Sequence, residues 1–126
     1  MKKDAATLAA AIELFALAVD TLRAVPGFPA VRLQRLDAFV AEARGDLQDL
    51  TRMRAELATL PRASPAAAAL KERIKGRNAE LPGLRSALNR NITYTELELV
   101  GPPAGHGNPG YIAFRAAVQR IYDLPK

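Results

Sequence analysis

The sequence predicts an all-α fold: a helical bundle built on a long antiparallel helix hairpin, with one irregular or extended arm before the last helix. Three observations lead to this prediction. Apolar residues recur at alternating steps of three and four along residues 33–57, which is the period of an amphipathic helix. The chain is rich in alanine and leucine, the strongest helix formers, and contains no tryptophan. Pro-Gly and Ser-Pro pairs divide it into segments of helical length.

Length and composition limit the class of protein. A chain of 126 residues suffices for one domain, and its 49% hydrophobic content allows a buried core. It has no cysteine, which excludes a disulfide scaffold, a thiol nucleophile and a Cys-ligated metal site. Arginine is much commoner than lysine and alanine is abundant, a composition typical of GC-rich bacterial or phage genomes.

The first helix is predicted over about residues 4–25. Asp4 is a suitable N-cap, and Pro26-Gly27 cannot continue a helix. The apolar line between these limits consists of Leu8, Ile12, Phe15, Val19 and Leu22. Further apolar residues flank this line, so we expect the helix to be covered on more than one side, at the centre of the bundle.

The apolar stretch from Ala5 to Val19 resembles a membrane segment only weakly. It contains Glu13, and its fifteen residues are too few to span a bilayer. We therefore expect a soluble, cytoplasmic protein that does not bind a membrane.

The second helix is predicted over about residues 29–60. Its seam has coiled-coil spacing, broken only by Arg54. The connection at 26–29 is so short that the first two helices should be antiparallel neighbours. At 1.5 Å per residue they are about 31 Å and about 46 Å long, so residues 50–60 overhang the first helix. That overhang needs cover from later helices or from another chain.

The second half of the chain is divided by proline and glycine. Ser64-Pro65 starts a helix over about 65–81, Pro82-Gly83 kinks or ends it, and a short turn follows at 84–90. Residues 92–100 begin with the β-branched and aromatic run Ile92 to Thr95, which favours an extended arm or a strand that pairs with another chain. The capping-box pattern of Thr93 with Glu96, or of Thr95 with Glu98, would instead start a short helix. A Gly- and Pro-rich loop at 101–110 precedes a last helix over 109–123, capped by Asn108.

No set of catalytic, metal or nucleotide-binding residues is visible. His106, the single histidine, has no evident nucleophile to serve, and one histidine with scattered glutamates does not make a metal site. The loop at 101–110 lacks the lysine and the Ser or Thr of a phosphate-binding loop. We therefore expect a protein that is not an enzyme and that needs no cofactor.

The predicted role is a small helical protein–protein interaction, adaptor or assembly module, with a protein partner or a homo-oligomer. The seam of the second helix fits burial within one chain and self-association equally well. The expected protein interface combines the overhang with the arm: Leu50, Met53, Arg54, Leu57, Leu60, Tyr94, Leu97 and Leu99.

Charge supports an alternative role in nucleic-acid binding. The net charge is +5, and the excess lies in residues 62–126, which hold ten basic and five acidic side chains. A basic face on the third helix would contact backbone phosphates rather than read bases, because aromatic residues for stacking are missing there. The expected phosphate contacts are Lys71, Arg73, Lys75, Arg77, Arg85 and Arg90.

Overall fold

The computed structural model describes residues 2–101 and 107–125, with side chains from residue 5 onward. This part of the chain forms four α-helices and no strand: α1 (Lys2–Leu22), α2 (Ala30–Thr59), α3 (Pro65–Leu99) and α4 (Pro109–Tyr122). The prediction of an all-α helical bundle is confirmed.

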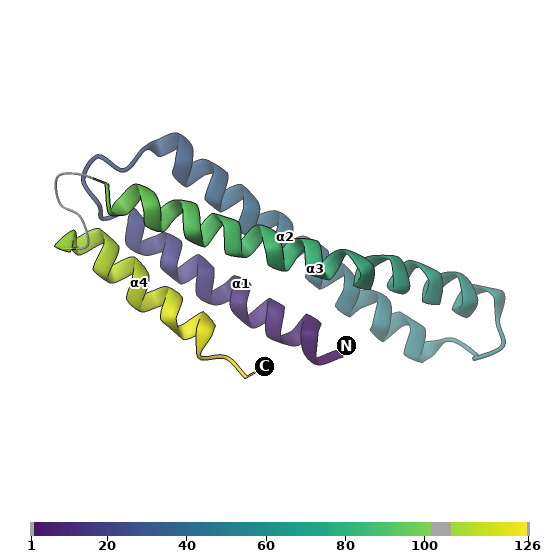
Figure 1. Cartoon of the computed structure of the whole chain (residues 1–126). Helices are drawn as coiled ribbons and strands as arrows, with labels where there is room; N and C mark the ends of the chain where they lie inside the picture. The colour runs from purple at the N-terminus through teal and green to yellow at the C-terminus, as the bar shows by residue number, and fades with distance from the viewer. Residues whose placement is uncertain (1, 102–106, 126) are drawn as a thin grey trace.

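Successive helices run in opposite directions around a shared core (Figure 1). Glu13 of α1 pairs with Arg44 in the middle of α2, and Arg32 at the start of α2 pairs with Glu98 at the end of α3. The helices differ greatly in length, at about 32, 45, 52 and 21 Å in chain order. As a result α2 and α3 extend together past the start of α1 (Figure 1), and we call this extension, residues 50–74, the stalk.

The main core is organised around α1. This helix supplies eight of the 22 buried apolar residues among the described positions, including Leu8, Ile12 and Phe15. The ring of Phe15 meets Phe39 of α2 edge-on, with the ring centroids 6.0 Å apart. From the other side Phe114 and Val118 of α4 pack against the same core and are fully buried.

A second, smaller core fills the stalk. Leu50 and Met53 of α2 pack there against Leu70 and Ile74 of α3, and Ala5 of α1 closes the cluster at its inner end. The overhang of α2 is therefore covered within the chain, by the first half of α3.

The expected extended arm at 92–100 is wrong, because these residues form the last turns of α3. Ile92, Thr95 and Leu99 are spaced by three and four and are all buried, so the helical period prevails over the alternating pattern. Their β-branched character costs a helix at most about 0.7 kcal/mol per residue. Burial of Ile92 and of Leu99 stabilises the folded state by roughly 2 kcal/mol each. A helix also satisfies the backbone groups that a lone strand would leave unpaired.

The helix predicted over 65–81 and the turn predicted over 84–90 are likewise parts of the single α3, which continues through Pro82. An internal proline removes one helical hydrogen bond and costs about 3 kcal/mol. Pro82 lies on the exposed side of α3, while Leu81, Leu84 and Leu88 pack on either side of it. These contacts hold the two halves of α3 in one line.

The starts of α3 and α4 follow the predicted capping chemistry, whereas α1 begins at Lys2, so that Asp4, its predicted N-cap, lies inside the helix. The hydroxyl of Ser64 accepts a hydrogen bond from the backbone N–H of Ala67 at 3.1 Å. The side-chain oxygen of Asn108 accepts one from the N–H of Gly110 at 2.8 Å. Half of the loop predicted at 101–110, residues 102–106 with His106 among them, lies outside the described residues.

Candidate interaction surfaces

The interface expected on the overhang of α2 is largely turned inward. Leu50 and Met53 are buried against α3, and Leu57 and Leu60 are half-buried against the same cluster. Arg54, the polar break in the seam, donates a hydrogen bond of 2.8 Å to the side-chain oxygen of Asn78 on α3. These five residues form the α2/α3 contact and leave little apolar surface for another chain.

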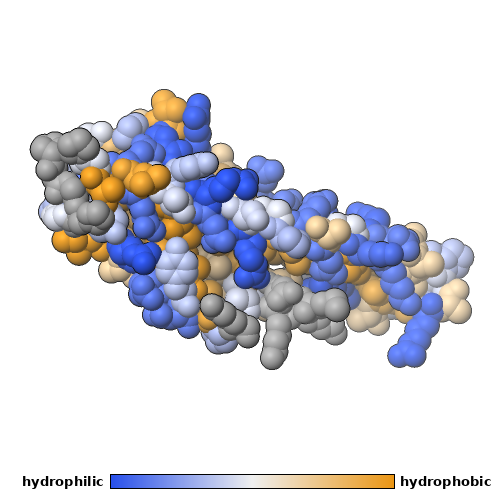
Figure 2. All heavy atoms as spheres, in the orientation of Figure 1, coloured by the Kyte–Doolittle hydropathy of each residue, from blue (hydrophilic) through white to orange (hydrophobic). Residues whose placement is uncertain are grey.

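The three interface residues expected from the arm divide between core and surface. Leu99 is buried in the main core. Tyr94 and Leu97 are 57% and 62% exposed, on the outer side of α3. On the face drawn in Figure 2, strongly hydrophobic residues gather at the end of the molecule away from the stalk, where α2 begins and α3 ends.

The six cations expected to contact phosphate do not act as one group. Arg77 lies 3.4 Å from Asp46, 3.7 Å from Asp49 and 3.7 Å from Glu80, so three acids already surround it. The other five make no ion pair with a described residue, and their side chains are exposed: Lys71, Arg73, Lys75, Arg85 and Arg90.

Helical spacing separates these five cations further. Lys71, Lys75 and Arg85 belong to one line along α3, in which residues recur at steps of four and three. The complete line is Lys71, Lys75, Asn78, Pro82, Arg85 and Asn89. Arg73 and Arg90 lie on other sides of the helix. We call the six residues from Lys71 to Asn89 that share one side of α3 the basic line; none of the six is acidic.

An open groove of about 1090 Å³ follows the last four residues of the basic line, from Asn78 to Asn89. Its floor is apolar and comes from two helices, with Leu8 and Ala11 of α1 beside Leu81 and Leu88 of α3. The groove exists because α4 is the shortest helix: it ends at Tyr122, where α1 and α3 both continue. Ile121 and Leu124, at and just past the end of α4, also line the groove.

The rim of the groove carries polar groups without negative charge. Asn78, Arg85 and Asn89 of the basic line border it, together with Ser86 and Thr7. Among the described lining residues there is no aspartate or glutamate. An apolar floor with a few polar groups and one uncompensated cation is typical of a binding site rather than of an ordinary surface.

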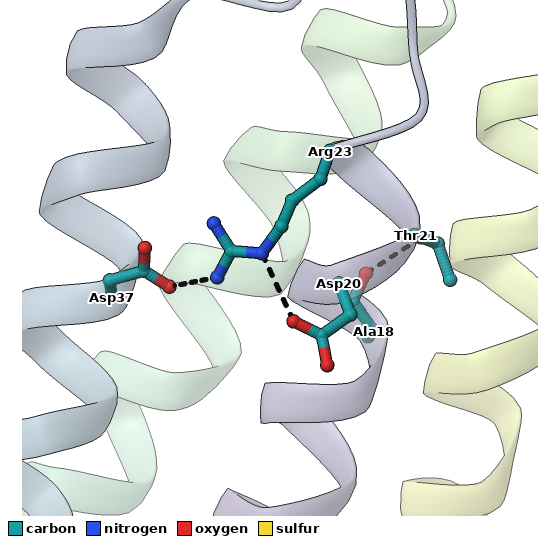
Figure 3. Close-up of polar contacts among 5 residues, drawn as sticks. All are labelled: Ala18, Asp20, Thr21, Arg23 and Asp37. Carbon is teal, nitrogen blue, oxygen red and sulfur yellow. Dashed lines mark hydrogen bonds and ion pairs between the residues drawn. The ribbon is translucent and has the colours of Figure 1, made fainter.

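Ion pairs elsewhere hold the helices together. Arg23 bridges Asp20 at 3.1 Å and Asp37 at 2.6 Å, tying the end of α1 to α2 (Figure 3), and both contacts raise the pKa of its guanidinium. Next to it, the hydroxyl of Thr21 donates to the carbonyl of Ala18 (Figure 3). Further along, two hydrogen bonds from Arg44 hold the pKa of Glu13 below its usual value. These pairs are exposed and border no groove, so we interpret them as structural.

Within the described ranges no three His, Cys, Asp or Glu residues are grouped as a metal ion would require. Residues 5–22 of α1 are long and apolar enough, by length and composition alone, to cross a membrane. This differs from the sequence-based estimate, which ended the apolar stretch at Val19. The same helix supplies part of the main core, and core helices share this composition.

Sequence reasoning missed the groove, although one signal for it was present. The predicted last helix is much shorter than the first, which leaves part of α1 without a neighbour. The basic line was noticed only in part, since its cations were pooled with others that lie on different sides of α3. Comparison of the chain with protein-family models, curated proteins and solved structures finds no match, so inference about function depends on its own geometry.

Proposed function

We propose that this protein is a non-enzymatic interaction module that binds a helical segment of a partner protein in the groove between α1, α3 and the end of α4. The observation that carries the proposal is the incomplete bundle: α4 covers only part of the surface that α1 and α3 offer. A helix laid in the groove would complete the four-helix cross-section, which is a common mode of peptide recognition.

The dimensions of the groove support a helical occupant. Its α3 wall extends from Asn78 to Asn89, about 17 Å or three helical turns. A helix of that length places three or four apolar side chains on one face, enough to cover a floor of this kind. The exposed Tyr94 and Leu97, at the other end of α3, offer a second surface on which an adaptor could hold a further protein.

A designed peptide tests the proposal directly. The probe is a helical peptide of about 18 residues, roughly 27 Å long, with leucines on one face and neutral glutamines on the other. Its affinity is measured by fluorescence anisotropy against the native protein and against Ser86→Trp, which fills the groove from an exposed position. The matched control is Ala79→Trp, an exposed position on α3 that does not line the groove.

We expect the peptide to bind the native protein and the Ala79 variant alike, and to lose at least about tenfold in affinity with Ser86→Trp, since the indole occupies its site. Equal affinity for both tryptophan variants would remove the groove as the binding surface. Sedimentation velocity on the protein alone provides the second readout, because a stable homodimer that buries Ser86 would replace a foreign partner with a second copy.

A further inference from the structure

We infer that the groove is built for an acidic partner: an amphipathic helix that continues the line of α4, with apolar residues on the floor and carboxylates toward the basic line of α3. This inference rests on the proposed function and adds the chemistry of the partner. It follows from the charges at the contact between α3 and α4, where the chain itself places one helix over another.

Where α4 covers α3, an ion pair joins the two helices above their shared apolar core. Arg115 of α4 lies 3.5 Å from Glu96 of α3 and also stacks over the ring of Tyr122. In this covered part α3 supplies the acid and the overlying helix supplies the base. Glu96 occurs eleven residues after Arg85, a spacing of about three turns, and so lies on the same side of α3.

Past the end of α4 the charge on this side of α3 is positive instead of negative. Arg85 lies at the rim of the groove with no ion-pair partner among the described residues, and Lys75 and Lys71 continue the basic line toward the stalk. The acids that neutralise Arg77 lie on the side of α3 that faces α2. An overlying helix would therefore have to supply the acid here. Its carboxylates would be spaced by about ten and fourteen residues to match Arg85, Lys75 and Lys71.

The same argument disfavours a second copy of this chain. Its net charge is +5, and the described part of α4, the helix that would have to be repeated, carries Arg115 and Arg120 and no acid. Such a helix would bring like charges to Arg85. Nucleic acid is disfavoured by the apolar floor, which offers phosphates no partner and where Tyr122 is the single aromatic side chain among the described lining residues.

The test compares three peptides on the native protein, so its result does not depend on whether a variant folds. All share the leucine face of the neutral probe, and the polar face is glutamate, glutamine or lysine. At low salt we expect the glutamate peptide to bind about tenfold tighter than the glutamine peptide, and the lysine peptide to bind most weakly. The advantage of glutamate should shrink as salt is raised, since exposed charges are screened.

A charge reversal on α3 then locates the contact. Arg85→Glu should weaken the glutamate peptide by about tenfold and strengthen the lysine peptide. Arg90→Glu is the matched control. Arg90 is an exposed arginine of the same helix, outside the groove and without an ion pair to a described residue, so reversal there should change affinity by less than about twofold. Circular dichroism checks that both variants keep the helical content of the native protein.

The outcomes separate this inference from the proposed function. Equal affinity for the glutamate and glutamine peptides, or equal effects of the two reversals, overturns the acidic partner and leaves the groove as a helix-binding site. Failure of all three peptides overturns both. Dodecyl phosphate and a random DNA duplex are tested in the same assay. If one of them binds tightly where the peptides do not, and Arg85→Glu abolishes that binding, the inference is overturned in favour of that ligand.

Discussion

Single ion pairs on this surface contribute little free energy each, yet they respond to pH in a definite direction. Glu13 and Arg44 form a two-pronged contact, with distances of 2.7 and 2.6 Å, between side chains that are about half exposed. Solvent screening limits such a pair to about 0.5 kcal/mol. Because the pair lowers the pKa of Glu13 in the folded state, the unfolded chain binds more protons in acid.

We therefore expect Glu13→Gln to lower the free energy of unfolding by about 0.5 kcal/mol at neutral pH. The difference from the native protein should persist above the usual glutamate pKa of 4.5 and vanish as the pH falls through the lowered pKa. Urea unfolding over a pH series measures it. Glu42→Gln is the control, at an exposed acid of α2 without an ion pair to a described residue, and an equal effect there would contradict the explanation.

Thr95 is the one fully buried polar residue among the described positions, and its hydroxyl has no hydrogen-bond partner. Replacing it with valine keeps the shape and removes the unsatisfied group. We expect Thr95→Val to raise the free energy of unfolding by about 1 kcal/mol. Thr95→Ser, which keeps the hydroxyl and loses a methyl group, should lower it by a similar amount, about 0.8 kcal/mol. Thermal unfolding of both variants measures these changes in stability. A loss of stability with Thr95→Val would show that the hydroxyl makes a stabilising interaction.

At the scale of elements, the glycines differ in what surrounds them. A Cβ added at Gly83 of α3 meets no atom within 4 Å, whereas one added at Gly110 of α4 would lie 2.6 Å from a methyl group of Val25. Gly83→Ala should stabilise the protein by about 0.5–1 kcal/mol through helix propensity. Gly110→Ala should destabilise it by about 1–3 kcal/mol, because the start of α4 is forced away from Val25 in the 23–29 connection.

Urea unfolding of the two alanine variants measures this contrast. In the Gly110→Ala background, Val25→Ala makes room for the new methyl group and should recover part of the loss. If Gly110→Ala proved as stable as the native protein, α4 would not pack as closely on the 23–29 connection as its backbone indicates.

The elements differ in how well their sequence defines them. Helices α2 and α4 begin and end within a residue or two of the expected positions, because Pro29, Leu60-Pro61 and Asn108-Pro109 give local signals. For α3 the local signals mislead: Pro82-Gly83 indicates a break, and Ile92 to Thr95 favour a strand. Burial of Leu88, Ile92 and Leu99 overrides both, and no local pattern reports how much surface another helix will cover.

At the scale of the whole molecule, the stalk is the part with least support. Each of its helices has one neighbour, and its core contains five buried residues, whereas the main core contains sixteen. Local opening follows the number of buried apolar contacts. We expect the amides of residues 53–74 to exchange with deuterium faster than those of α1, with opening free energies lower by about 2 kcal/mol.

Two leucine variants sharpen this prediction. Leu70→Ala, in the stalk, should speed exchange there and leave the main core protected. Leu36→Ala, in the main core, should lower protection throughout, with a loss of about 2–5 kcal/mol in each case. Uniform exchange along α3 in the native protein would mean that the stalk and the main core open as one unit.

The candidate site could be foreseen only in part. Helix lengths read from the sequence already indicate that α2 extends past α1 and that some other element must cover the segment from Leu50 to Leu60. They do not say that the first half of α3 provides the cover, since helix length alone does not tell which neighbour packs on the overhang. The basic line depends on α3 continuing through Pro82, because only an unbroken helix keeps Lys71 and Arg85 on one side.

The far tip of the stalk has a practical consequence. The exposed residues 61–63 lie beyond the main core, at the opposite end of the stalk from α4 (Figure 1). Lengthening such a turn costs only about 0.6 kcal/mol for each doubling of its length. The tip is therefore a suitable insertion point for a fluorescent domain or a surface-attachment sequence, which would turn the protein into a reporter while leaving its groove free.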